Sequence, residues 1–150
     1  MYVGVKHSPE STKLFWFSVP DNIAHRIMLG SRITCDTKKG NNEHGVVCQI
    51  NNQVLDAEGL KRLTSNHKLK SITGVECDML LSDIQIPNKF SRTTVHPDKI
   101  ERRVQEFEST GSFNTPVVVR AANSSLADGY SAYLAALRLG RNTIRCVIKK

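Results

Sequence analysis

The chain has 150 residues, of which 39% are hydrophobic and 23% charged. This composition excludes a collagen-like, linker-like or disordered chain, and the length suits one ordinary domain or two small ones. Lys and Arg exceed Asp and Glu by 7, an excess that favours anionic partners: nucleic acid, nucleotides or an acidic protein. No apolar run approaches the roughly 20 residues that cross a bilayer, and the first residues lack a secretory pattern. We therefore expect a cytoplasmic protein without membrane partners.

The first third of the chain has the pattern of short strands. Alternating apolar residues and an aromatic run predict four of them, at 3–5, 14–17, 33–37 and 46–50. A loop at 19–22 and a turn at 38–42 separate them. Short strands with turn residues at regular spacing predict a small β-barrel-like unit over residues 1–52.

A helix and a connection are expected to follow at residues 53–80. Asp56 has the position of an N-cap, Glu58 lies in the first turn, and Lys61 and Arg62 lie in the last. These residues predict a helix at 56–64. Residues 68–78 fit either a further strand or a connection between two domains.

The second half predicts an α/β unit over residues 81–150, which makes the whole chain α+β. Its expected strands are 84–86, 116–120, 126–129 and 144–148. A helix that starts at Pro97 and stops at Gly111 and another over 130–140 alternate with them.

The cysteines and histidines show no spacing typical of a metal site or a redox motif. Cys35, Cys48, Cys77 and Cys146 form no CxxC pair, and we expect reduced, buried thiols on strands. The five histidines form no HxH or HExxH pattern. We therefore expect no metal, no cofactor and no catalytic residue.

The strand–Asp128-Gly129–helix junction is the most informative feature of the sequence. The backbone N–H groups of the first helical turn have no intrahelical acceptors, and a glycine lets an anion approach them closely. The junction therefore predicts a phosphate site. It also fits a tight strand-to-helix turn in which Asp128 is the N-cap.

The order of motifs from Ile84 to Ile148 resembles the ParB/sulfiredoxin-like superfamily, which includes chromosome-partition CTPases, sulfiredoxins and a free-serine kinase. The motifs are Ile86-Pro87 with Arg92, Pro116–Val119, Leu126–Tyr130, Tyr133–Ala136, Leu139-Gly140 and Ile144–Ile148. The resemblance implies that the glycine and the next residues of this helix bind nucleotide phosphates. On this basis Asp128, Gly129, Tyr130, Ser131 and Arg92 are the candidate phosphate-binding residues.

The sequence departs from the family at the phosphate motif. The family's arginine, three residues after the glycine, is replaced by Ala132, and the sulfiredoxin Cys and His positions hold Tyr130 and Ser131. The resemblance therefore does not imply sulfiredoxin activity. Either Arg92, Lys89 or Arg138 supplies the missing charge, or nucleotide binding is lost.

The first unit faintly resembles the small barrels at the front of the replication-restart helicase PriA. The likeness lies in Phe15-Trp16-Phe17, Val19-Pro20, Gly30-Ser31 and His44–Val47. It implies a contact with DNA or a protein, although the aromatic residues also fit a barrel core. The candidate nucleic-acid-binding residues are basic: Lys38, Lys39, Lys61, Arg62, Lys68 and Lys70.

Three functions fit these residues. The first is a non-catalytic ParB-like module that binds nucleic acid or nucleotide in a regulatory or mobile-element (phage or plasmid) setting. The second is a nucleotide-dependent phosphotransferase or nuclease with Asp128 as acid–base or metal-ligand group. The third is a protein-interaction module that inhibits a nucleic-acid-binding enzyme. Of these, the sequence favours the non-catalytic module.

Overall fold

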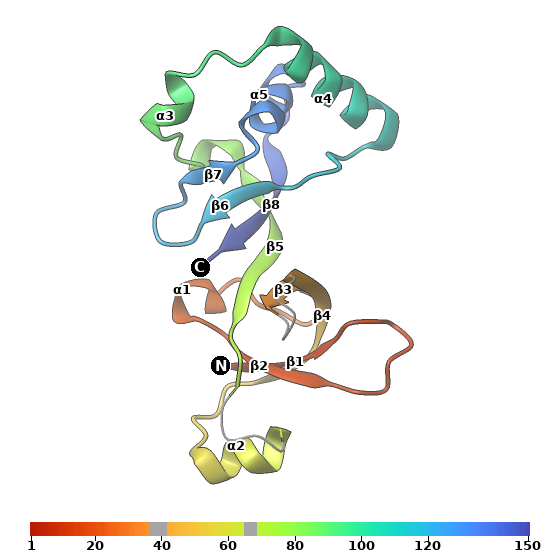
Figure 1. The fold of residues 1–150 in the computed structure, drawn as a ribbon, viewed down its shortest axis with the longest axis vertical. Helices are drawn as coiled ribbons and strands as arrows, with labels where there is room; N and C mark the ends of the chain where they lie inside the picture. The colour runs from red at the N-terminus through yellow and green to blue at the C-terminus, as the bar shows by residue number, and fades with distance from the viewer. Residues whose placement is uncertain (37–41, 65–68) are drawn as a thin grey trace. The chain divides into compact units, whose positions relative to one another are not determined.

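The computed structural model describes residues 1–36, 42–64 and 69–150. It is a mixed α+β protein, as the sequence predicts, and it divides into two compact units (Figure 1). The first unit comprises Met1–Val75 together with Lys150, and the second comprises Glu76–Lys149. Within the described ranges, no helix combines the length and the apolar character that crossing a membrane requires.

The first unit is an antiparallel sheet with the strand order β2-β1-β4-β3-β5. β1 (Tyr2–Lys6) pairs with β2 (Phe15–Ser18) on one side and with β4 (Asn42–Asn51) on the other. β4 pairs in turn with β3 (Arg32–Asp36), and β3 pairs with the first residues of β5 (Ile72–Leu80). The four strands predicted in this region are confirmed.

Two of these predictions differ in extent from the structure. β4 begins at Asn42, well before the predicted start at residue 46, because it pairs with β3 as far as Asp36↔Asn42. The predicted turn at 38–42 lies almost wholly outside the described residues.

The sheet of the first unit curls on itself. The Ser18 N–H, at the end of β2, donates a hydrogen bond to the Lys70 carbonyl over 2.9 Å. The hydroxyl groups of Ser18 and Ser71 lie 3.0 Å apart, and the two residues form a parallel bridge. The end of β2 is thereby joined to the residues just before β5. The inner face of the curled sheet carries the core, which includes Val3, Val5, Ile33 and Val47.

A short helix, α1 (Asp21–Ala24), follows Pro20 where the sequence predicts a loop at 19–22. The loop prediction is wrong there because Ile23 is fully buried. Four residues carry too little local helical preference to be recognised in the sequence, and burial of one isoleucine stabilises the turn instead.

The predicted helix at 56–64 is present as α2 (Ala57–Thr64). The Asp56 Oδ1 atom accepts a hydrogen bond from the Gly59 N–H over 2.8 Å, so the predicted N-cap is confirmed. None of the residues of α2 is buried. The ambiguous segment at 68–78 forms β5 from Ile72 onward.

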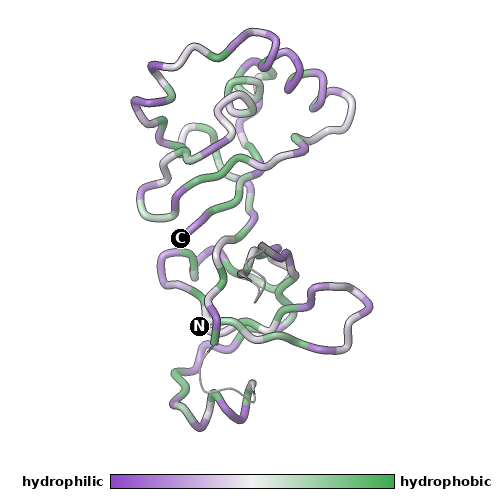
Figure 2. The backbone as a smooth tube through the Cα atoms, viewed as in Figure 1, coloured by the Kyte–Doolittle hydropathy of each residue, from purple (hydrophilic) through white to green (hydrophobic). Residues whose placement is uncertain are grey.

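The second unit contains the rest of β5 and three further strands, in the order β5-β8-β6-β7. β6 (Val117–Arg120) pairs in parallel with β8 (Thr143–Lys149) and antiparallel with β7 (Leu126–Asp128). All three were predicted. Figure 2 shows β6 and β8 as mainly hydrophobic, and Cys146–Ile148 of β8 form a continuous buried run.

The strand predicted at 84–86 is wrong. A 3-10 helix, η1 (Leu81–Asp83), occupies the preceding residues, and Gln85 makes one isolated bridge with Ser125. Leu81 and Ile84, three residues apart as suits the turn of a 3-10 helix, are both buried in the core, and Pro87 has no N–H with which to continue a ladder.

Three helices complete the second unit: α3 (Asn88–Ser91), α4 (Pro97–Thr110) and α5 (Tyr130–Arg138). α4 starts at a proline and ends at Gly111, which has φ +76°, as predicted from helix-end preferences. It is largely hydrophilic in Figure 2, and Val104 is its buried residue.

All four cysteines lie on strands and none forms a disulfide. Cys35 and Cys146 are buried, as predicted, and Cys77 is half-buried. The prediction is wrong for Cys48, which is exposed on β4. The strand alternates between faces, and the neighbouring Val47 occupies the inner face instead.

Candidate functional site

The start of α5 is a tight junction in which glycine is required for two reasons. Gly129 follows β7 with φ +90°, in the left-handed region. A Cβ atom built on it would lie 3.0 Å from the Val117 Cα atom and 3.1 Å from its Cγ2 atom. Close packing of the junction against β6 therefore accounts for this glycine without any ligand.

Asp128 does not cap α5, so the N-cap interpretation from the sequence is wrong. The N-cap residue is Gly129, which has no side chain to cap with. The Asp128 Oδ1 atom accepts a hydrogen bond from the adjacent Gly129 N–H over 2.7 Å. The N–H groups of Tyr130, Ser131 and Ala132 precede the first intrahelical bond, so they retain donor capacity.

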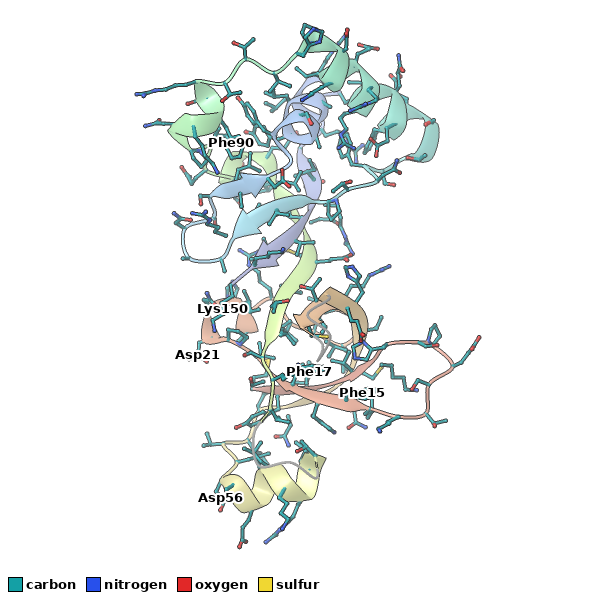
Figure 3. All side chains as sticks on the ribbon, viewed as in Figure 1. Phe15, Phe17, Asp21, Asp56, Phe90 and Lys150 are labelled. Carbon is teal, nitrogen blue, oxygen red and sulfur yellow. The ribbon has the colours of Figure 1, made fainter. Side chains whose placement is uncertain are left out.

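An aromatic row lies beside this helix start. The rings of Phe90 and Tyr130 are 5.4 Å apart, and Tyr130 stacks on Tyr133 with a centroid distance of 6.3 Å. Burial raises the pKa of the Tyr133 hydroxyl, and the adjacent Tyr130 raises it further. Figure 3 labels Phe90, which α3 contributes to the row.

Two of the three cations considered as substitutes for the missing arginine belong to the helix that carries Phe90. The Lys89 Nζ atom lies 4.6 Å from the centroid of the Phe90 ring, and Arg92 is exposed at the C-cap of α3. Arg138 is engaged elsewhere, since its Nη1 atom pairs with Glu101 Oε2 over 2.9 Å.

The replacement of the family's arginine by Ala132 has a structural counterpart. The Ala132 side chain is 2% exposed, so it belongs to the core of the second unit. A guanidinium group at this position would be buried or would have to displace its neighbours, and burying an unpaired charge is costly.

The structure describes three of the six basic residues predicted to bind nucleic acid. Lys61 and Arg62 are exposed on α2, where Arg62 pairs with Glu58 over 3.4 Å. Lys70 is exposed just before β5. The remaining three, Lys38, Lys39 and Lys68, lie outside the described residues.

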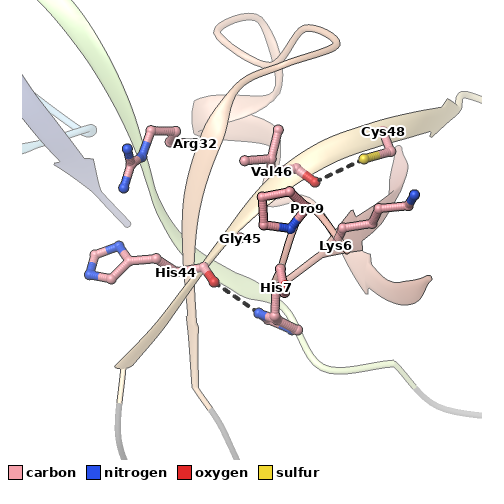
Figure 4. Close-up of a pocket in the computed structure, with 9 residues that line it drawn as sticks. Lys6, His7, Pro9, Arg32, His44, Gly45, Val46 and Cys48 are labelled. Atoms are coloured by element: carbon pink, nitrogen blue, oxygen red, sulfur yellow. Dashed lines mark hydrogen bonds between the residues drawn. The ribbon is translucent and has the colours of Figure 1, made fainter. Parts of the chain in front are cut away.

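The sequence analysis did not identify a cavity of about 550 Å³ on the first unit. Figure 4 shows its lining, which comes from β1, β3, β4 and the residues after β1: Lys6, His7, Ser8, Pro9, Arg32, His44, Gly45, Val46 and Cys48. The register of the three strands brings this lining together, because Lys6 lies opposite Val46 on β4 and Val46 lies opposite Arg32 on β3.

These cross-strand partners point to the same face of the sheet. His44 joins them because it is two residues from Val46 on the same strand. In Figure 4, Arg32 and His44 lie on one side of Val46 and Lys6 on the other. We call Lys6, Arg32, His44 and Val46 the basic row.

A hydrogen bond joins two segments that line the cavity, β4 and the residues that follow β1. The His7 Nδ1 atom lies 2.9 Å from the His44 carbonyl oxygen and donates a hydrogen bond to it in the corresponding tautomer. Gly45 permits this close approach, because a Cβ atom on it would lie 2.3 Å from the Val5 Cγ1 atom and 3.2 Å from the His7 Nδ1 atom. The cavity is therefore supported by packed strands rather than by loops alone.

In residues 1–36, 42–64 and 69–150, no group of three or more His, Cys, Asp or Glu side chains is suited to hold a metal ion.

No protein-family model matches the sequence, and no curated protein matches it. Three solved structures resemble about half of the chain. The sulfiredoxin from Arabidopsis thaliana is 25% identical with a TM-score of 0.45, and the match covers 50% of this chain and 84% of that one. The C-terminally truncated chromosome-partitioning protein ParB from Caulobacter crescentus, complexed with CTP-γ-S, is 19% identical with a TM-score of 0.43, covering 50% and 44%. A Pnob8-like ParB-N domain is 16% identical with a TM-score of 0.42, covering 52% and 31%.

The present chain thus spans less than half of the two ParB proteins that it matches. The solved structures with this partial likeness are a sulfiredoxin and two ParB proteins, the families that the sequence from Ile84 to Ile148 resembles.

Proposed function

We propose that this protein is a non-catalytic, ParB-like module that binds an anionic partner, and that the basic row of the first unit binds the phosphates of nucleic acid. The observation that carries the proposal is the cross-strand alignment of Lys6, Val46 and Arg32 beside a cavity of about 550 Å³. Strands hold the backbones of two cations and His44 in place on one face, so little backbone order has to be gained on binding.

The distribution of charge along the chain supports this location. Residues 1–75 and 150 contain eleven Lys and Arg against six Asp and Glu, a net charge of +5. Residues 76–149 contain ten against eight, a net charge of +2. The electrostatic attraction for a polyanion is therefore concentrated in the first unit.

The spacing of the row suits a nucleic-acid backbone. Lys6 and Arg32 are on strands separated by β4, so their backbones lie about 10 Å apart. The exposed Val46 between them offers an apolar surface for sugar or base. No ion pair involves Lys6 within the part of the chain that the structure describes, so its ammonium group is available to a phosphate.

We further propose that the first unit is a small barrel. The parallel bridge between Ser18 and Ser71 supports this, because it links the end of β2 to the residue just before β5, the first and last strands of this unit's part of the sheet. Closure would leave the basic row on the outside of the barrel, since the inner face is filled by Val5, Ile33 and Val47.

The nucleotide-phosphate site at Asp128, Gly129, Tyr130, Ser131 and Arg92 remains a prediction. The aromatic row and Lys89 beside the helix start favour it, while the exposed Asp128 carboxylate opposes it by repelling an anion. An NMR titration with phosphate tests it, because the amides of Tyr130 and Ser131 should shift before others. If the chemical shifts of the Tyr130 and Ser131 amides stay constant while those of other amides change, the result counts against this second site.

Binding of a labelled oligonucleotide, followed by fluorescence anisotropy between about 50 and about 200 mM salt, tests the main proposal. We expect weak, sequence-independent binding that falls steeply with salt. Lys6→Ala should lower affinity and reduce the salt slope by about 0.7 to 0.9, the value for one lost phosphate contact. Lys99→Ala, on exposed α4 of the second unit, is the matched control and should change neither.

The other two functions have distinct outcomes in the same preparation. Steady ATP or CTP hydrolysis, or nicking of DNA, that disappears in Asp128→Asn would favour the enzyme. Salt-tolerant capture of a protein without any oligonucleotide binding would favour the interaction module. The absence of a complex with any oligonucleotide at low salt would refute the proposed function.

A further inference from the structure

The pairing of the strands brings Trp16, the single tryptophan of the chain, to the face of the first unit that carries the basic row. From this placement we infer that the ligand of the first unit is single-stranded nucleic acid and that one of its bases stacks on the Trp16 indole. This inference rests on the proposed function and deepens it, because the basic row by itself does not distinguish a single strand from a duplex.

The register of β1 and β2 fixes the face to which Trp16 points. Trp16 lies opposite Gly4, and cross-strand partners point to the same face of a sheet. Gly4 is two residues from Lys6 on β1, so these two residues also share a face. The bulge in the pairing of β1 with β4 does not change this, because its extra residue, Cys48, belongs to β4. Trp16 is therefore on the same face of the sheet as Lys6.

The core of the first unit does not account for this tryptophan. The neighbouring residues on β2, Phe15 and Phe17, each lie opposite a buried valine of β1, so they point to the inner face. Trp16 points away from that face and is only half-buried. Its indole is thus an aromatic side chain that partly faces solvent outside the core.

The indole ring packs over Gly4. A Cβ atom built on Gly4 would lie 3.3 Å from the Trp16 Cζ2 atom and 3.4 Å from its Cε2 atom, so the missing side chain leaves room for the ring on β1. This contact restricts the ring before any ligand binds. A tryptophan side chain also has only two χ angles, so stacking of a base on it costs little conformational entropy.

The ring lies within reach of the basic row. Because Trp16 is opposite Gly4, it is a diagonal neighbour of Lys6, and such neighbours are about 7–8 Å apart on one face of a sheet. Gln49 lies opposite Gly4 on β4 and is exposed, so its amide can hydrogen-bond a base beside the ring. A base on the indole and a neighbouring phosphate on the Lys6 ammonium group can therefore be bound together.

The combination of phosphate contacts and a stacking ring favours a single strand. In a duplex the bases are paired and stacked inside the helix, so a ring on the protein surface cannot reach their faces. Phosphate contacts alone would be shared by both forms. Base–aromatic stacking requires unpaired bases and tolerates any sequence, because every base has a π-face.

The first test uses the intrinsic fluorescence of the full-length protein, which reports on one ring because the chain has a single tryptophan. The probe is an unlabelled oligothymidine of about twelve nucleotides, alone or annealed to its complement, at about 50 mM salt. Titration with the single strand should quench the emission of Trp16, because a stacked base contacts the ring directly. Titration with the duplex should leave the emission nearly unchanged.

The second test measures affinity for the same oligothymidine, now labelled, by fluorescence anisotropy. Trp16→Leu, which keeps an apolar side chain but removes the ring, should lower single-strand affinity by about tenfold and leave duplex affinity and the salt slope unchanged. Trp16→Phe keeps a ring and should retain most of the affinity. Phe15→Leu is the matched control, since it removes the next ring on the inner face, and it should change neither affinity.

The two proposals fail in different ways. Equal quenching by single strand and duplex, a Trp16→Leu variant that binds the single strand like the wild type, or an equal loss in Phe15→Leu overturns the inference, while the effect of Lys6→Ala on the salt slope still supports the proposed function. Circular dichroism checks that each variant keeps the fold, and the quenching test with the unmodified protein decides if Trp16→Leu does not fold. If neither form of the oligonucleotide binds at low salt, both proposals are refuted.

Discussion

Two features of the structure favour glycine at position 129, its positive φ and its close contact with Val117. Alanine substitutions at Gly129 and at a matched glycine can measure the two costs separately. Gly129 has φ +90°, and a Cβ atom on it would meet the Val117 Cα atom at 3.0 Å. The first cost is conformational, and the second is steric. Gly111 shares the first cost, with φ +76°, but nothing lies within 4 Å of a Cβ built on it. Gly111→Ala is therefore a matched control in the same unit.

The magnitudes follow from these contacts. A non-glycine residue in the left-handed region costs about 1–2 kcal/mol, and alanine recovers about 0.4–1 kcal/mol by restricting the unfolded chain. Gly111→Ala should therefore destabilise by between about 0 and about 1.6 kcal/mol. At Gly129 the contact is with backbone, which cannot rotate away, so an overpacking cost of about 1–3 kcal/mol is added.

Thermal unfolding of the full-length chain measures the difference. For a unit of this size, 1 kcal/mol shifts Tm by about 4–8 °C. The added overpacking cost should lower the transition of the second unit by about 4–24 °C more in Gly129→Ala than in Gly111→Ala. If Gly129→Ala and Gly111→Ala have the same Tm, close packing on Val117 is not the reason for glycine at position 129. Binding of a ligand at this helix start then becomes the better explanation.

Two further predictions concern ionisable groups in the second unit. Burial acts to raise the pKa of Glu106, but hydrogen bonds from the Asn114 N–H and the Arg103 guanidinium outweigh it and lower the pKa. The stabilisation from Glu106 is therefore present at neutral pH and is lost as pH falls through the lowered pKa. Glu106→Gln should cost about 1–2 kcal/mol at pH 7, and this cost should shrink steadily in melts at pH values below about 4. A cost that does not change with pH would refute this. The pKa of Tyr133 is raised in the folded protein, so as pH rises above about 10 the Tyr133 hydroxyl loses its proton in the unfolded chain first. The free energy of unfolding therefore declines until pH passes the raised pKa. In an absorbance titration, Tyr130→Phe should lower the pKa of Tyr133, and an unchanged titration would contradict the role of the Tyr130 phenol.

The sequence alone determined most of the secondary structure, because local signals were strong where elements were long or clearly ended. The helix from Pro97 to Gly111 is an example, since proline suits a helix start and a left-handed glycine suits its end. The strand around Val117–Val119 is another, since a continuous apolar run bounded by turns is typical of a buried strand. Asp56 as the N-cap of α2 follows from the same kind of local chemistry.

The prediction failed where a tertiary contact outweighed a local signal. α1 exists because Ile23 is buried, and residues 84–86 are not a strand because Leu81 and Ile84 anchor a 3-10 turn in the core. The Asp128 carboxylate accepts a hydrogen bond from the Gly129 N–H and does not cap α5. The N-cap position is taken by Gly129, which packs closely against Val117. None of these contacts leaves a periodic pattern in the sequence.

The candidate site shows the same division. The sequence established a basic chain and a glycine at a helix start, because charge and backbone conformation are properties of single residues. It could not reveal that Lys6, Val46 and Arg32 form one row, since their alignment depends on the register of three strands and on the bulge between Gly4 and Val5. A slip of one residue would have turned Lys6 or Arg32 to the buried face. Register, fixed by packing of the whole unit, therefore decided which of the many basic residues of this chain lie together.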